Sequence, residues 1–232
     1  MKKIYYLFLG LLLISCNSTL DVTNNQEPEN PNYTYLALGD SYTIGESVVE
    51  TQRWPVQLAE QLRARGYKLA PPKIIAKTGW TTEDLLKGMD NELTVHREFD
   101  LVSILIGVNN QYQGKLITEY EEDLRTIFRR AINRSKTKEN GVFAVSIPDY
   151  GYTPFGAARQ EEISEEIDRY NEVFRRVATD FNVPFYNITP ISREAESNPD
   201  LIASDDLHPS GLMYQRWVDQ FVNQVAEKLS AM

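Results

Sequence analysis

Hydrophobic residues follow two alternating patterns from residue 33 onward. Short, nearly continuous apolar runs rich in Val, Ile, Leu, Phe and Tyr occur at 33–39, 73–76, 101–107, 141–147 and 184–188. Such runs are typical of strands that are buried on both faces of a parallel sheet. Between them, apolar residues recur at steps of three and four, which is the spacing of an amphipathic helix. The pattern therefore predicts strands that alternate with helices.

Three local signals suggest where some of the helices begin. Pro55 suits the first turn of a helix, because proline lacks the N–H that would be unpaired there. Thr118 and Glu121 have the spacing of a capping box, which predicts a helix directly after Thr118. Pro209 is expected to start the last helix. The apolar positions expected on the buried sides of the helices are Val56, Leu58, Ala59, Leu62, Leu124, Ile127, Phe128, Ala131, Ile163, Ile167, Tyr170, Phe174, Val177, Phe181, Val218, Phe221, Val225 and Leu229.

The alternation predicts the fold class and the edge of the sheet that carries chemistry. Strand–helix–strand units imply right-handed crossovers and a parallel sheet with helices on both faces. We expect one three-layer, flavodoxin-like α/β domain with a five-stranded parallel sheet over residues 33–232. Ligands bind such sheets outside the carboxyl ends of the strands, so polar residues that directly follow a strand are the first candidates for a site.

The first fifteen residues have a different composition. Lys2 and Lys3 precede an apolar stretch at 4–14 that is too short to span a bilayer comfortably. A basic start, a short apolar region and a small residue before the cleavage point are typical of a secretory signal peptide. Residues 1–15 are therefore predicted to be a signal peptide, and the protein is predicted to be exported.

Cys16 is the only cysteine of the chain and follows this stretch directly. Residues 13–16, LISC, resemble a bacterial lipobox, which implies that Cys16 is lipidated and anchors the protein to a bacterial membrane on its periplasmic or cell-surface side. The alternative is a plain signal peptide with an incidental cysteine. Residues 16–32 are polar and rich in Asn and Pro, which predicts a flexible tether.

Composition restricts the class of protein and its partners. The chain has 232 residues, of which 42% are hydrophobic and 25% charged, as in an ordinary globular protein. Its formal net charge is −9. We expect no nucleic-acid partner, because binding to phosphates requires a basic face.

The strand ends bring together the groups that acyl transfer from an ester requires. Ser41 follows the first predicted strand, Gly79 the second and Asn109 the third, and a long irregular segment after the fifth contains His208. Acyl transfer needs a nucleophile, a base, a group that orients the base, and donors for the developing oxyanion. All of these candidates are expected on one edge of the sheet.

Only two histidines are available as the base. His96 precedes the third strand, so it is expected at the amino edge of the sheet, away from the serine. His208 lies on the loop before the last helix, three residues after Asp205. This spacing lets the Asp205 carboxylate reach the Nδ1–H of the ring and leaves Nε2 to face the serine. Asp206 is the rival partner for the histidine.

Four blocks carry a resemblance to a known family. They are GDSYTIGE around Ser41, KTGWTTEDL around Gly79, IGVNNQ around Asn109, and DDLHPS before the last helix. In this order they resemble the blocks of the SGNH hydrolases, the large group within the GDSL esterase/lipase family. The resemblance extends from Tyr35 to about Tyr214. By themselves Gly-Asp-Ser and Asp-x-x-His are weak signals, but four blocks in order are a strong one.

The resemblance implies a role for each candidate. Ser41 would be the nucleophile, with His208 as the base and Asp205 as the group that orients it. The backbone N–H groups of Ser41 and Gly79 and the side chain of Asn109 would form the oxyanion hole. The implied activity is a serine esterase, or acylhydrolase, with a small acyl ester or an acylated carbohydrate as substrate. We expect no metal and no organic cofactor.

The chain departs from the family pattern at two positions. Asn110 stands where the family usually has aspartate, so a retuned pocket is expected, and Thr78 stands where asparagine often precedes the glycine. Four aromatic residues near the blocks are candidates either for the core or for the walls of the substrate site, and these are Trp80, Tyr150, Tyr152 and Phe155.

Three alternative functions stay open. One is an acyltransferase that uses the same triad with a sugar hydroxyl in place of water. Another is a non-catalytic lipoprotein that binds glycan or lipid on the same fold. The weakest is a nucleotide-binding domain, because no Gly-x-Gly-x-x-Gly sequence follows the first strand.

Overall fold

The computed structural model describes residues 28–231. The predicted signal peptide, the predicted lipidation site Cys16 and residues 16–27 of the predicted tether lie outside this range. The chain joins the domain at Asn32, whose backbone N–H donates to the carbonyl of Lys68 at 2.9 Å. Within residues 28–231, no helix combines the length and the apolar character that crossing a membrane would require.

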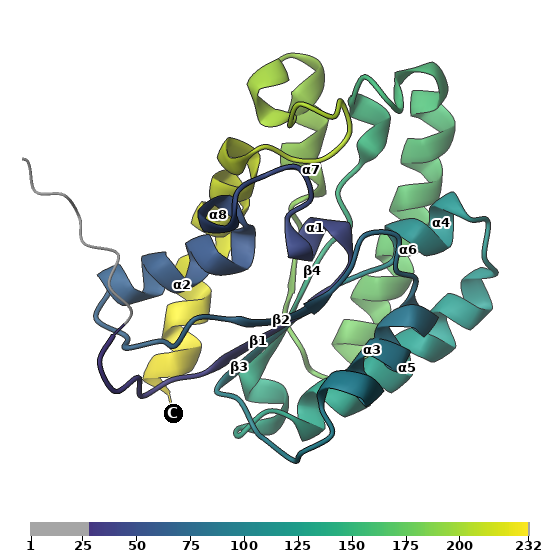
Figure 1. Ribbon diagram of the computed structural model, residues 1–232. Coiled ribbons are helices and arrows are strands. Elements are labelled where there is room, and N and C mark those ends of the chain that lie inside the picture. Colours follow the sequence, from purple (N-terminus) through teal and green to yellow (C-terminus); the bar gives the residue numbers. More distant parts are fainter. Residues whose placement is uncertain (1–27, 232) are drawn as a thin grey trace, which may run out of the picture.

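The sheet has the predicted class and the flavodoxin-like strand order (Figure 1). Five parallel strands pair in the order β2-β1-β3-β4-β5. Their bounds are β1 Tyr35–Gly39, β2 Lys73–Ala76, β3 Leu101–Leu105, β4 Val142–Val145 and β5 Phe185–Tyr186. Most strands are shorter than predicted, because the flanking apolar residues are buried without joining the ladder. The strand order reverses at β1, which places the crevice for a ligand between the carboxyl ends of β1 and β3.

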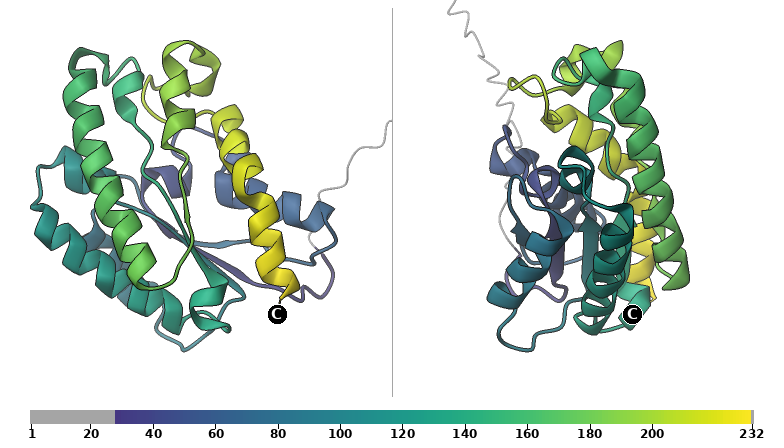
Figure 2. Two further views of the ribbon diagram at one scale, coloured as in Figure 1. Left: turned by 180° about the vertical axis from the view of Figure 1, so that it is seen from behind. Right: turned by 90° about the vertical axis from the view of Figure 1, so that its right-hand side faces the viewer.

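Long helices cover both faces of the sheet (Figure 2). One face carries α2 (Trp54–Ala64) and α8 (Gly211–Ser230), and the other carries α3 (Thr82–Glu92), α5 (Ile117–Asn133) and α6 (Gln160–Asp180). Nearly all of the predicted apolar positions are buried against the sheet. Val56 is only half-buried, because α2 starts at Trp54 and turns Trp54 and Pro55 into the core instead.

Short elements connect the long ones at the carboxyl edge of the sheet. The α-helices α1 (Ser41–Ile44), α4 (Val108–Tyr112) and α7 (Thr189–Arg193) follow β1, β3 and β5. Residues 28–231 also contain six 3-10 turns, of which η2 directly precedes β4 at the amino edge; they are η1 Glu50–Gln52, η2 Lys138–Gly141, η3 Tyr150–Tyr152, η4 Ala157–Arg159, η5 Glu194–Glu196 and η6 Pro199–Leu201.

The predicted capping box at Thr118 and Glu121 is wrong. Helix α5 begins two residues earlier than predicted, at Ile117, and its N-cap Leu116 makes no side-chain hydrogen bond. The Glu121 carboxylate accepts hydrogen bonds from Arg125 at 2.8 Å and Arg176 at 2.6 Å. Two guanidinium partners are stronger donors than one backbone N–H, so the carboxylate does not turn back to cap the helix.

A capping box is present instead at the start of α3. The Thr81 hydroxyl accepts from the backbone N–H of Asp84, and the Asp84 carboxylate accepts from that of Thr81. The last helix also starts later than Pro209, because Ser210 is its N-cap and accepts from the N–H of Met213 at 3.3 Å.

Candidate active site

Ser41 is the first residue of α1, where β1 turns sharply at the edge of the sheet. The preceding Asp40 is the N-cap and accepts the N–H of Tyr42 at 3.1 Å. Gly39 has no room for a side chain, because a Cβ would lie 2.1 Å from the Thr43 hydroxyl and 2.4 Å from the carbonyl oxygen of Leu105. The tight turn leaves Ser41 only 5% exposed and holds its backbone rigidly.

Asp205 and His208 form the predicted pair. Asp205 Oδ2 lies 2.6 Å from His208 Nδ1, and Oδ1 accepts the backbone N–H groups of Leu207 at 3.1 Å and His208 at 2.9 Å. The hydroxyl of Ser47 donates to Oδ2 at 2.5 Å. Asp206 is exposed and has a left-handed backbone with φ of 62°. The structure therefore places Asp205, and not Asp206, against the imidazole.

Hydrogen bonding determines the ionisation of Asp205. Partial burial by itself would raise the pKa of this carboxyl group. The hydrogen bonds from Ser47, His208 and Leu207 outweigh that effect and hold the pKa of Asp205 well below its usual range. Asp205 is thus a carboxylate at neutral pH and can only accept the hydrogen bond that it shares with Nδ1 of His208.

Four of the predicted residues line one cavity. Ser41, Gly79, Asn109 and His208 all face a cavity of about 200 Å³ at the carboxyl edge of the sheet. Asp205 lies behind His208 and does not line the cavity itself. The structure thus brings together every residue that the sequence nominated for catalysis.

The loop after β2 and the helix α4 supply two of the candidate oxyanion donors. Gly79 follows β2 with a φ of 85°, a conformation that favours glycine. Asn109 lies on α4, and its Nδ2 donates one hydrogen to the carbonyl of Trp80 at 2.9 Å. This bond ties the loop after β2 to α4 and orients the amide. The second hydrogen on Nδ2 has no protein acceptor within the described residues, and the side chain lines the cavity.

Asn110, the departure from the family pattern, points away from the cavity. It is buried, its Oδ1 accepts the N–H of Thr82 at 3.0 Å, and its Nδ2 donates to the Thr82 hydroxyl at 2.8 Å. That hydroxyl donates its single proton to Asp123 at 2.7 Å. The side chain at position 110 must therefore accept from the Thr82 backbone N–H and also donate to the Thr82 hydroxyl oxygen, because the hydroxyl proton is bound to Asp123. An amide can do both, whereas a carboxylate can only accept. Asn110 therefore joins α4 to the start of α3 and does not shape the pocket as expected.

Thr78, the other departure, does line the cavity, and its hydroxyl donates to the carboxylate of Glu46.

The aromatic candidates divide between wall and core. Tyr150 and Phe155 line the cavity, whereas Trp80 packs against Gly88, where a Cβ would come within 2.3 Å of the indole. Tyr152 lines a second cavity nearby.

Sequence reasoning missed several residues of the site, Tyr112 and Ser47 among them. Tyr112 lines the cavity, and its ring centroid lies 6.3 Å from those of both Tyr150 and Phe155. It follows Asn109 by three residues on α4, which is the spacing that could have nominated it. Ser47, which holds Asp205, carries no local signal. His96 lines a different cavity, beside Glu98 and before β3, as its position predicted.

Asp40 is a buried carboxyl group next to Ser41. Complete burial raises its pKa from 3.8 to about 7, although the backbone N–H groups of Tyr42 and Gly107 oppose the shift. One carboxyl oxygen, Oδ2, has no hydrogen-bond partner within residues 28–231. In that same range, no group of three or more His, Cys, Asp or Glu residues is placed to hold a metal ion.

A flavodoxin-like sheet with a buried serine, a histidine and an amide at its carboxyl edge defines the class of the protein. The profile of the GDSL-like lipase/acylhydrolase family matches residues 37–216. The chain therefore belongs to this family, and it is a hydrolase that acts on ester bonds. No curated protein sequence is similar enough to be matched to it.

Solved structures share the fold at low sequence identity. A lipase/acylhydrolase from Enterococcus faecalis has a TM-score of 0.68 at 20% identity, over 84% of this chain and 96% of that one. The psychrotrophic esterase EstA from Pseudoalteromonas sp. has a TM-score of 0.64 at 18% identity, over 86% and 100%. Axe2, an acetylxylan esterase from Geobacillus stearothermophilus, has a TM-score of 0.66 at 20% identity, over 84% and 94%.

Proposed function

We propose that this protein is an exported serine esterase that removes small acyl groups, acetyl in particular, from carbohydrate. The observation that carries the proposal is the shared cavity of about 200 Å³, which Ser41, Gly79, Asn109 and His208 all line while Asp205 holds the Nδ1 of His208. This arrangement contains the nucleophile, the base, the orienting carboxylate and the donors that acyl transfer needs.

Acylation of Ser41 is the first half of the proposed reaction. His208 Nε2 takes the hydroxyl proton as Oγ attacks the ester carbonyl, and the carbonyl electron pair moves onto oxygen. The N–H groups of Ser41 and Gly79 and the free Nδ2–H of Asn109 stabilise that oxyanion. When the tetrahedral intermediate collapses, the C–O bond to the leaving alcohol breaks and His208 returns the proton to the alcohol oxygen.

Deacylation repeats the same steps with water as the nucleophile. His208 takes a proton from water, whose oxygen attacks the acyl-enzyme, and then protonates Ser41 Oγ as the carboxylic acid leaves. The ionised Asp205 stabilises the imidazolium that forms in both halves, because the pKa of its carboxyl group lies well below neutrality.

The size of the cavity supports a small acyl group. A cavity of about 200 Å³ is below the ~300–1,000 Å³ that is usual for sites that enclose a whole small molecule. Its wall carries the aromatic rings of Tyr112, Tyr150 and Phe155, which suit a short apolar group or the face of a sugar. The fold shared with the acetylxylan esterase Axe2 agrees with an acetylated carbohydrate.

The N-terminal sequence supports export and anchoring. We include in the proposal that residues 1–15 are removed and that Cys16 is lipidated, with residues 16–32 as the tether. The domain would then act next to a bacterial membrane on its periplasmic or cell-surface side.

A panel of p-nitrophenyl esters of rising chain length, assayed beside acetylated xylan, tests the activity. We expect the highest kcat/KM on acetate, release of acetate from the xylan, and no turnover by Ser41→Ala. A serine-directed phosphonate should label the wild type and not Ser41→Ala. Absence of both labelling and turnover would refute the esterase proposal, and transfer of acetyl to an added sugar in preference to water would indicate an acyltransferase.

A further inference from the structure

A second, larger cavity lies beside the catalytic one and has no part in the reaction described above. It measures about 390 Å³ and lies between two segments of the chain, 151–157 and 195–203, with Gln160 and Asp206 at its rim. The catalytic cavity holds only a small group, so any larger part of a substrate must extend into neighbouring space. This cavity has room for such a part, and residues next to those of the catalytic cavity line it.

The two cavities share a wall. The ring of Phe155 lines the catalytic cavity, and its backbone N–H donates to the carbonyl of Asp206, which lines the second cavity, at 3.1 Å. Tyr150 lines the first cavity, and the next two residues, Gly151 and Tyr152, line the second. The two cavities therefore adjoin across the segment that carries Tyr150 and Phe155.

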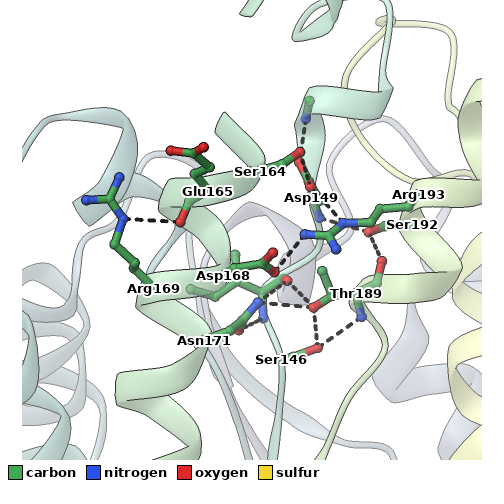
Figure 3. A network of polar contacts seen from close by, with 12 residues as sticks. Ser146, Asp149, Ser164, Glu165, Asp168, Arg169, Asn171, Thr189, Ser192 and Arg193 are labelled. Carbon is green, nitrogen blue, oxygen red and sulfur yellow. Dashed lines mark hydrogen bonds and ion pairs between the residues drawn. The ribbon is translucent and has the colours of Figure 1, made fainter. Parts of the chain in front are cut away.

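A network of polar contacts around the buried Asp149 joins the segments that flank the second cavity (Figure 3). Asp149 is buried, and its carboxylate accepts from Ser164 on α6 at 2.7 Å, from Gly151 N–H at 2.8 Å and from Arg193 Nε at 3.0 Å. Arg193 also donates to Asp168 at 2.7 Å. Gly151 begins one wall and Arg193 lies two residues before the other, so this network ties the two walls together.

The same arginine orients an aromatic ring of the cavity. The Arg193 guanidinium carbon lies 5.9 Å from the centroid of Tyr152, which is a cation–π distance. The cavity is thus preformed, and binding does not have to bear the entropy cost of ordering its walls.

The lining indicates the chemical class of the ligand. Polar groups come from Tyr152, Gln160, Glu196 and Asp206, and apolar surface comes from prolines and alanines. Gln160 and Glu196 make only a long hydrogen bond to each other, at 3.4 Å, so both can rearrange toward a ligand. The carboxylates of Glu196 and Asp206 would repel an anionic ligand, and their polarity does not suit a long acyl chain. Carboxylates, an amide and an aromatic ring together suit the hydroxyl groups and the apolar face of a neutral sugar.

We propose that this second cavity is a subsite for the carbohydrate part of the substrate, which is the leaving alcohol of the ester. The inference rests on the proposed function, which it extends from the acyl group to the glycan. It assigns Gln160 and Glu196 to the binding of sugar hydroxyl groups and the 151–157 segment to the glycan-facing wall.

Matched substitutions on one short turn test the subsite. Ala157 and Ala158 are both exposed on η4, but only Ala157 lines the cavity. Ala157→Phe should block the cavity, and Ala158→Phe should leave it open. A second pair compares Glu196→Gln with Glu161→Gln, because Glu161 is an exposed acid on α6 outside the cavity.

The readout is kcat and KM on p-nitrophenyl acetate and on an acetylated xylo-oligosaccharide. On the oligosaccharide, we expect both Ala157→Phe and Glu196→Gln to lower kcat/KM by roughly tenfold or more, mainly by raising KM. Ala157→Phe does so because it fills the cavity. Glu196→Gln does so because it removes a hydrogen bond between the sugar and a charged group. Hydrolysis of p-nitrophenyl acetate should stay at the wild-type rate, and both control variants should match the wild type on both substrates.

Failure of the subsite and failure of the esterase proposal give different results. If p-nitrophenyl acetate is hydrolysed but Ala157→Phe and Ala158→Phe behave alike on the oligosaccharide, the subsite is wrong and the esterase stands. If Ala157→Phe lowers kcat/KM on p-nitrophenyl octanoate and on no other substrate, the cavity holds an acyl chain, and the subsite proposal is also overturned. If neither p-nitrophenyl acetate nor the acetylated oligosaccharide is hydrolysed, the esterase proposal fails, and calorimetry with the deacetylated oligosaccharide tests the subsite alone. The subsite then requires that the wild type binds this oligosaccharide and that Ala157→Phe does not.

Discussion

Replacing Asn109 by alanine separates a catalytic amide from one that merely stabilises a turn. The Asn109 side chain has two amide hydrogens, and one is bound to the carbonyl of Trp80 at 2.9 Å. The other has no protein acceptor within residues 28–231, and the side chain lines the cavity together with Ser41. In the ground state the ester oxygen is nearly neutral, so this donor contributes little to binding. In the tetrahedral intermediate the oxygen is an anion, and a preorganised donor contributes about 3–4 kcal/mol.

We therefore expect Asn109→Ala to lower kcat by roughly 10²–10³ with little change in KM. Loss of the bond to Trp80 should lower the free energy of unfolding by only about 1 kcal/mol. Asn109→Asp should reduce kcat at least as much, because a carboxylate there repels both the oxyanion and the Trp80 carbonyl.

The neighbouring Asn110 provides the matched control. Its amide makes two hydrogen bonds to Thr82 and does not line the cavity. Asn110→Ala leaves a buried backbone N–H unpaired, so it should lower the free energy of unfolding by about 1–3 kcal/mol while kcat for each folded molecule stays close to the wild type.

Phosphonate labelling counts the active molecules, a p-nitrophenyl acetate assay measures kcat and KM, and urea titration measures stability. The reasoning is refuted if Asn109→Ala shows the pattern expected of Asn110→Ala, with stability lost and kcat retained.

Three further predictions concern other groups. Asp205→Asn should fold normally and lower kcat by about 10⁴, because the wrong imidazole tautomer then faces the serine, whereas Asp206→Asn should change kcat little; the opposite result would assign the role to Asp206. Because burial raises the pKa of Asp40 to about 7, its stabilising contribution is complete below the unfolded pKa and is lost as pH rises through 7. Asp40→Asn should remove a decrease of about 3 kcal/mol in the free energy of unfolding between pH 4 and 7, measured by urea titration across pH, and an unchanged slope would contradict this. Cys16→Ala should release an active domain from the membrane fraction, and a wild type that is soluble with an unmodified N-terminus would contradict lipidation.

Much of the fold follows from local patterns in the sequence. Strands buried on both faces must be nearly continuous in apolar residues, so the runs at 33–39 and 101–107 predicted β1 and β3 to within two residues at each end. A parallel sheet places successive strand ends on one edge, which is why Ser41, Gly79 and Asn109 could be placed together before any coordinates. The pairing of Asp205 with His208 needs only a turn of three residues.

Tertiary packing decided the features that join distant parts of the chain. Ser47 reaches Asp205 across 158 residues, and no local pattern relates the two. The capping box at Thr118 failed because Arg176, 55 residues beyond Glu121, takes the carboxylate. A periodic pattern reports which face of an element is buried but not which residue of another element it meets.

The second cavity depends most strongly on the tertiary structure. Its two walls are separate in the sequence, and the ion pair that holds them joins Asp149 to Arg193 across 44 residues. Neither residue has a periodic or motif signal that would mark it as a partner of the other. A buried charge is stable only where folding brings an opposite charge and hydrogen bonds to it, so the packing of η3, α6 and α7 determines this pair and the cavity beside it.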